Sequence, residues 1–139
     1  MTDTLVRDAM VPDPTSLQES ATAQEAGREL SDPEVRAVLV CADGGALVGV
    51  VTRKTLVREV VAAGLDPRET QLRAIAEPPA YTLEAAMPLD EAFQLVESLD
   101  LERVPVVEDG KLVGILSRAV VQRRLAEDEP PPAESDLGD

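Results

Sequence analysis

The sequence predicts an α+β fold built from two copies of one β-α-β-β-α unit. Three observations support this: an internal duplication with an offset of about 66 residues, a hairpin signal in each half, and an aliphatic composition with almost no aromatic residues. The duplication is clearest where Gly49–Arg53 (Gly-Val-Val-Thr-Arg) recurs as Gly114–Arg118 (Gly-Ile-Leu-Ser-Arg). Because the two halves keep register through several elements, we interpret the chain as a tandem repeat.

The first half contains the elements of the unit in order. A short strand is expected around Leu17, and a helix is expected from Thr22, which opens the Thr-x-x-Glu pattern of a capping box. Two strands over 37–42 and 47–51 flank a turn that contains Asp-Gly, a sequence typical of a β-hairpin. Thr52 then stands where the N-cap of a second helix belongs.

The second half repeats this order. A strand is expected around Leu83, and Pro88 suits the first turn of the helix that follows. Strands over 104–107 and 112–116 again flank an Asp-Gly turn, and Ser117 takes the N-cap position of the last helix.

Short lead-in helices over 3–10 and 70–76 precede the two units, and a Pro-containing link joins them. We therefore divide the chain into a first repeat with its lead-in helix, a second repeat, and an acidic, Pro-rich tail. These segments are residues 1–66, 67–126 and 127–139. The tail carries no basic residue, and its composition predicts disorder.

Composition excludes several kinds of chemistry. The chain has no His and one Cys, so a His-based catalytic pair, a Cys/His zinc site and an internal disulfide are all excluded. A net charge of −14 and only two aromatic residues argue against binding to nucleic acid. No segment resembles a membrane helix or a secretory signal, which predicts a cytoplasmic protein. Cys41 ends an apolar strand and is expected to be a buried structural thiol.

The ordered motifs resemble a known family. Val6–Pro12 reads Val-Arg-Asp-Ala-Met-Val-Pro, Arg103–Val107 reads Arg-Val-Pro-Val-Val, and each half has a Gly-h-h-Thr/Ser sequence (h, hydrophobic) before a helix. In this order, and duplicated, these motifs resemble a tandem CBS-domain pair, or Bateman module, over residues 4–126.

This resemblance implies two repeats related by a pseudo-twofold axis, and a stand-alone regulatory module that is not an enzyme. It also implies two related sites in the cleft between the repeats, which bind adenosine-containing ligands such as AMP, ADP, ATP or S-adenosylmethionine. No cofactor or metal is required. The expected partners are a second copy of the chain, as a homodimer, and a separately encoded protein effector.

The resemblance also implies which residues line these sites. In the first repeat they are Met10, Pro12, Arg36, Ala37 and Val38, and in the second they are Pro78, Ala80, Tyr81, Arg103, Val104 and Pro105. Tyr81 has two interpretations: it stacks on a base, or it is a partly buried strand residue.

The strand-to-helix junctions are candidate anion sites. The first amides of a helix lack internal partners and lie at the positive end of the helix dipole, so a phosphate can bind there beside the hydroxyl of Thr52 or Ser117. Basic residues follow both junctions, and they form a candidate cluster of Arg53, Lys54, Arg58 and Arg118. The alternative is that Thr52 and Ser117 only cap their helices, and that Arg58 only pairs with surface acids.

One departure from the family weakens both sites. Ligand-binding repeats continue Gly-h-h-Thr-x-x-Asp, and the Asp holds the ribose hydroxyls, but Thr55 and Val120 stand at these positions here. Losing a hydrogen bond to a charged group typically costs about 1.5–3 kcal/mol. Two hypotheses therefore remain: a ligand-sensing module, or a ligand-free scaffold for dimerisation and protein interaction with degenerate nucleotide sites.

Overall fold

The computed structural model describes residues 4–128. Most of the tail predicted over 127–139 lies outside this range, and Glu127 and Asp128 end the last helix. The first repeat has a three-stranded sheet in the order β2-β3-β4, with β2 and β3 parallel and β3 and β4 antiparallel. Its elements are β2 (Ser16–Gln18), α2 (Ala23–Leu30), β3 (Val38–Cys41), β4 (Leu47–Val51), α3 (Arg53–Leu56) and the π-helical segment η1 (Val57–Val61).

The second repeat has the same order of elements. Its sheet runs β1-β7-β6-β5, with β5 and β6 parallel and both β6–β7 and β1–β7 antiparallel. The elements are β5 (Leu83–Glu84), α5 (Leu89–Ser98), β6 (Arg103–Glu108), β7 (Lys111–Ser117) and α6 (Arg118–Asp128). The predicted α+β fold with two β-α-β-β-α units is confirmed.

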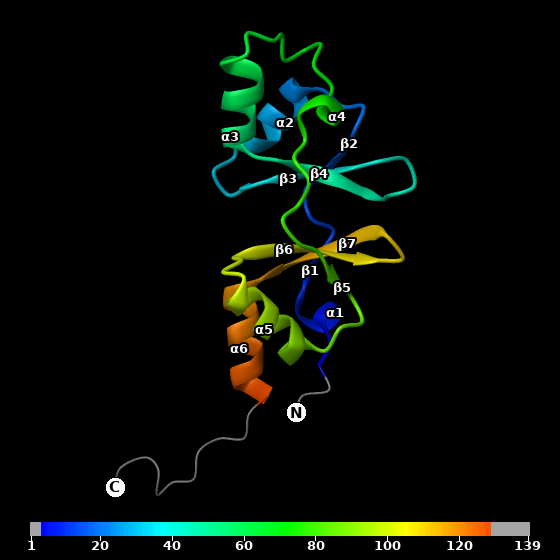
Figure 1. Cartoon of the computed structure of the whole chain (residues 1–139), viewed down its shortest axis with the longest axis vertical. Helices are drawn as coiled ribbons and strands as arrows, with labels where there is room; N and C mark the ends of the chain where they lie inside the picture. Colours follow the sequence, from blue (N-terminus) through cyan, green and yellow to red (C-terminus); the bar gives the residue numbers. More distant parts are fainter. Residues whose placement is uncertain (1–3, 129–139) are drawn as a thin grey trace, which may run out of the picture.

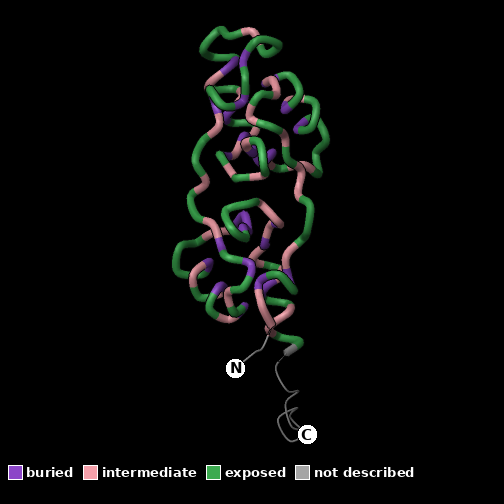
Figure 2. The backbone as a smooth tube through the Cα atoms, turned by 90° about the vertical axis from the view of Figure 1, so that its right-hand side faces the viewer, coloured by how far each residue is buried: buried purple, intermediate pink, exposed green. Residues whose placement is uncertain are grey.

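The two sheets face each other at the centre of the molecule, and the helices cover their outer sides (Figure 1). Figure 2 shows buried residues gathered in each half, with two chain segments running between the halves. This arrangement places the ends of β3, β4, β6 and β7 at the junction of the repeats.

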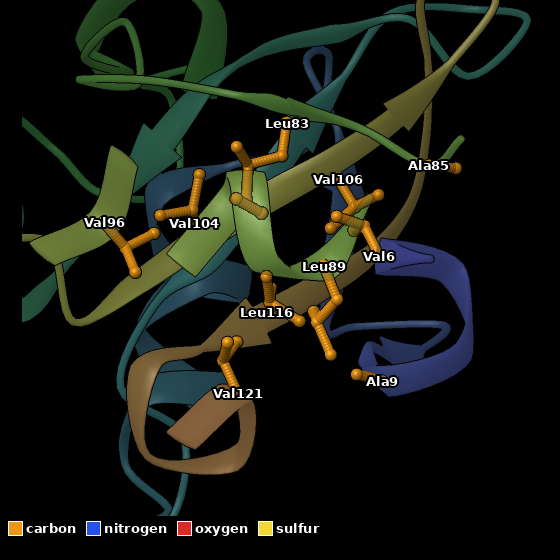
Figure 3. Close-up of a cluster of buried hydrophobic side chains, with 11 residues drawn as sticks. Val6, Ala9, Leu83, Ala85, Leu89, Val96, Val104, Val106, Leu116 and Val121 are labelled. Atoms are coloured by element: carbon orange, nitrogen blue, oxygen red, sulfur yellow. The ribbon is translucent and has the colours of Figure 1, made fainter. Parts of the chain in front are cut away.

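Each lead-in segment packs against the repeat that it does not precede. Helix α1 (Val6–Ala9) and strand β1 (Val11–Pro12) join the second repeat, where Val6 lies beside Leu89 in the core (Figure 3). Helix α4 (Leu72–Ile75) joins the core of the first repeat. The division at residue 66 therefore follows the sequence duplication, whereas the two packed bodies exchange their lead-in segments.

Local signals in the sequence act as expected. The backbone N–H of Glu25 donates to the Thr22 hydroxyl at 3.2 Å, which caps α2. Asp109 and Gly110 have φ angles of 54° and 79°, the left-handed pair that a two-residue hairpin turn requires. Cys41 is buried, as predicted, and burial raises the pKa of its thiol. No helix among the described residues is long and apolar enough to span a membrane.

Candidate functional site

Two cavities lie between the repeats. The first, which we call the Thr52 pocket, has a volume of about 300 Å³ and takes side chains from both repeats. Its lining residues are Val50, Thr52, Thr55, Glu77, Pro78, Pro79, Ala80, Tyr81, Leu101, Arg103, Val104 and Pro105. The end of β4 thus meets the lead-in segment and the start of β6 of the other repeat, so the pocket exists only when the repeats are packed together.

The second cavity, which we call the Arg36 pocket, has a volume of about 330 Å³. Its lining residues are Val11, Asp13, Pro14, Thr15, Glu34, Val35, Arg36, Ala37, Leu39, Val50, Arg103, Pro105 and Ile115. Val50, Arg103 and Pro105 line both pockets, so the two cavities share a wall. The Arg36 pocket combines two arginines with two carboxylates, Asp13 and Glu34.

Thr52 and Thr55 form a reciprocal cap at the start of α3. The backbone N–H of Thr52 donates to the Thr55 hydroxyl at 3.0 Å, and the backbone N–H of Thr55 donates to the Thr52 hydroxyl at 3.3 Å. The two hydroxyl oxygens lie 3.1 Å apart. Thr55 is only 2% exposed, so its hydroxyl is used within the protein, while the more accessible Thr52 side chain reaches the cavity.

Glu77 brings a carboxylate to this cap. Its backbone N–H donates to the Val50 carbonyl at 3.0 Å, and its carbonyl accepts from the Val50 N–H at 2.8 Å, which fixes the residue to the edge of β4. The Thr55 hydroxyl donates to Oε1 of Glu77 at 3.5 Å, and Arg58 forms an ion pair with the same oxygen. Thr55 and Arg58 therefore hold the Glu77 side chain beside the pocket.

Arg103 is the cation of the Thr52 pocket. Its side chain is exposed and forms no hydrogen bond or ion pair with any residue in the part of the chain that the structure describes. The lining also has apolar residues, which include Pro78, Tyr81 and Pro105, and Tyr81 is 39% exposed. An unpartnered guanidinium next to an apolar wall suits an anion that carries a flat, apolar group.

The predicted basic cluster is not brought together. Arg53 donates to the Asp32 carbonyl at 2.9 Å, and Arg58 pairs with Glu59 and Glu77. Neither of these arginines lines the two pockets. The acid pairing of Arg58 that the sequence left open is therefore present.

Arg118 is held by the second repeat itself. It donates to Asp100 at 2.8 Å and to the Leu101 carbonyl at 3.0 Å, and Glu97 and Glu102 lie within 3.8 Å of its guanidinium. The hydrogen bond to Asp100 raises the pKa of Arg118. The side chain is only 16% exposed, so Arg118 contributes to stability and not to an open anion site.

The other predicted site residues fall into four groups. The Ser117 hydroxyl accepts from the Val120 N–H at 3.1 Å and so caps α6. Val38 is fully buried in the core of the first repeat, and Met10 packs against the core of the second. Pro12 lies in β1 opposite Gly114. The remaining predicted residues line the pockets: Arg36 and Ala37 the Arg36 pocket, Thr52, Thr55, Pro78, Ala80, Tyr81 and Val104 the Thr52 pocket, and Arg103 and Pro105 both.

Sequence reasoning missed Glu77 and Leu101. Glu77 directly precedes Pro78, the first lining residue predicted in the second repeat, so the predicted set began one residue too late. Leu101 lies in the loop before β6 and carries no motif. Within residues 4–128, no group of three or more His, Cys, Asp or Glu side chains is arranged to hold a metal ion.

Comparisons with known proteins place this fold in a family. The CBS domain matches residues 6–62 and 72–127. Hypoxic response protein 1 of Mycobacterium tuberculosis (strain ATCC 25618 / H37Rv) is 31% identical over 124 residues, which cover 89% of this chain and 87% of that protein.

Two solved structures are also similar. The crystal structure of Hypoxic Response Protein I with two coordinated zinc ions has a TM-score of 0.73 and 30% identity, and it covers 86% of this chain and 98% of its own. The crystal structure of CBSX2 in complex with AMP has a TM-score of 0.71 and 25% identity, and it covers 91% of this chain and 98% of its own. Two matched domains, the shared fold and the motif order lead to one conclusion: the chain belongs to the CBS-domain family and contains a tandem pair of CBS domains.

Proposed function

We propose that this CBS-domain pair is a regulatory module that binds an adenine nucleotide or a related anion in the Thr52 pocket. The observation that carries the proposal is Arg103, an arginine without a partner in the described chain, in a pocket built by both repeats. Tyr81 and the prolines provide an apolar wall for a base, and Thr52 lines the same pocket. CBSX2, which has the same fold, has been crystallised with AMP.

The position of the pocket suggests how binding is used. A ligand in the Thr52 pocket contacts β4 of one repeat and β6 of the other, so it stabilises one relative placement of the two repeats. A ligand shifts a conformational equilibrium by the difference in its affinity for the two states. The module therefore acts by binding, without catalysis, and it requires no cofactor.

Arg103→Gln is expected to weaken binding of the best nucleotide by about tenfold to a hundredfold, since it removes a hydrogen bond from a charged group. Isothermal titration with AMP, ADP, ATP and S-adenosylmethionine measures this effect. Arg123→Gln is the matched control, because Arg123 is exposed on α6 and lines neither pocket. Absence of binding below millimolar concentrations by all four ligands would refute the proposal.

A separate surface supports the scaffold function. A groove of about 480 Å³ lies between α2 and η1, and it is lined by apolar residues that include Leu56, Val60 and Leu65. Val57 and Val61, one helical turn apart, are 59% and 72% exposed beside it. We propose that a second copy of the chain covers this groove, which makes the protein a homodimer.

Val61→Glu is expected to convert this homodimer into a monomer, because it places an unpaired charge in an apolar interface. Sedimentation velocity measures the change, with Val48→Glu as the control on an exposed position of β4. A wild-type protein that sediments as a monomer at all concentrations contradicts the homodimer and favours a separately encoded effector as the occupant of the groove.

A further inference from the structure

We propose that Glu77 is the residue of the Thr52 pocket that recognises a pair of neighbouring hydroxyl groups on the ligand. This inference rests on the proposed function and names the chemical group of the ligand that Glu77 recognises. Among the described residues, Glu77 is the only carboxylate that lines the Thr52 pocket. A carboxylate is the side chain best suited to accept two hydrogen bonds from a vicinal diol.

The Glu77 carboxylate is oriented and retains free capacity. Oε1 accepts from the Thr55 hydroxyl and from Arg58, whereas Oε2 has no hydrogen-bond partner among the described residues. The backbone of Glu77 is fixed to Val50 by two hydrogen bonds, so the carboxylate does not have to be ordered when a ligand arrives. An acceptor held in place before binding loses little side-chain entropy when it engages the ligand.

Thr55 is a positioning residue in this arrangement. Its hydroxyl accepts from the Thr52 backbone N–H at 3.0 Å and donates toward Glu77 at 3.5 Å. Thr55 is only 2% exposed where it lines the pocket, and its hydroxyl is engaged by Thr52 and Glu77, so we assign its effect on the ligand to Glu77. Glu77, held by the Thr55 hydroxyl, therefore supplies the carboxylate of the pocket, although residue 55 itself is not acidic.

The duplication shows that this pair is specific to one pocket. Glu77 pairs with Val50 at the edge of β4, and the equivalent contact in the other half joins Val11 to Ile115 at the edge of β7. The residue equivalent to Thr55 is Val120. The residues equivalent to Glu77 and Thr55 are therefore both valines, and the carboxylates of the Arg36 pocket, Asp13 and Glu34, come from other positions.

The test compares AMP with 2′-deoxy-AMP and 3′-deoxy-AMP by isothermal titration. The wild-type protein is expected to bind AMP about tenfold more tightly than either deoxy analogue, the factor expected for one hydrogen bond to a charged group. In Glu77→Gln the three affinities are expected to agree within about twofold, since the amide offers a single weaker acceptor. Glu77→Asp keeps the charge on a shorter side chain and is expected to retain a reduced preference.

Two control variants lie outside the pocket. Arg123→Gln changes an exposed arginine of α6 that lines neither pocket and is expected to keep the preference for AMP. Glu84→Gln changes an exposed carboxylate of β5 that lines neither pocket and is also expected to keep it. Binding of AMP with an unchanged preference in Glu77→Gln overturns this inference and leaves the proposed function intact. Failure of all three nucleotides to bind the wild-type protein overturns both this inference and the proposed function.

Discussion

Leu72→Ala should destabilise the first repeat by about 2–5 kcal/mol, the range for truncating a fully buried leucine. Leu72 lies in the second half of the chain, yet it is 0% exposed within the core that also contains Val38 and Val51. Its backbone N–H donates to the Ala21 carbonyl at 2.8 Å, so α4 is tied to the start of α2 as well. Chemical denaturation of the full chain measures the loss of unfolding free energy.

Two further measurements make this result specific to the exchanged lead-in segment. Leu99→Ala is the matched control, because Leu99 is 47% exposed and lines none of the cavities described above, and it should cost less than about 0.5–1 kcal/mol. Amide hydrogen exchange in Leu72→Ala should accelerate in β3 and β4 before it accelerates in β6 and β7. Faster exchange confined to the second repeat would show that α4 does not support the first repeat.

Gly49→Ala should destabilise the protein by about 1–3 kcal/mol, because a methyl group does not fit between β4 and the lead-in segment of the other repeat. A Cβ atom at residue 49 would lie 2.7 Å from the Glu77 carbonyl oxygen and 2.9 Å from the Ala76 Cβ. Both neighbours belong to a segment fixed by backbone hydrogen bonds to Val50, so neither moves without breaking that pairing. The same displacement would shift Glu77 within the Thr52 pocket.

Gly27→Ala is the control for this substitution. Gly27 lies inside α2, and a Cβ there meets only Leu56 Cδ1 at 3.8 Å, an ordinary contact. Alanine at this helical position should stabilise the protein by about 0.5–1 kcal/mol. Thermal unfolding should therefore move in opposite directions for the two variants. Equal stability of Gly49→Ala and Gly27→Ala would show that the close approach at β4 is relaxed in solution.

Part of the Thr52 pocket could be predicted from the sequence. Pro78, Ala80 and Tyr81 were predicted as lining residues and lie in the Thr52 pocket. The acid that accompanies them was not predicted, because position 55 carries Thr and the carboxylate comes from residue 77 in another part of the chain. Sequence spacing predicts which residues of one helix or strand lie on the same face. Thr55 and Glu77 come from different segments of the chain, so spacing does not predict their contact.

Arginine placement marks a second limit. Arg53 and Arg118 occupy equivalent positions in the duplication, and local sequence predicts the same role for both. In the structure, acids from α5 and the following loop surround Arg118, whereas the one hydrogen-bond partner of Arg53 within residues 4–128 is a backbone carbonyl. The difference depends on which charges a distant loop brings near, and no pattern around residue 118 encodes that.

The sequence by itself determined the duplication, the order of elements, the caps at Thr22 and Thr52 and the Asp109-Gly110 turn. These features depend on hydrogen bonds and backbone angles within a few residues, so local composition specifies them. Only the tertiary structure decided that the lead-in segments exchange between repeats, and that Thr52, Glu77 and Arg103 line one shared pocket. These contacts arise because the two repeats pack against each other. That packing brings together residues that are far apart in the sequence, so local sequence patterns do not predict them.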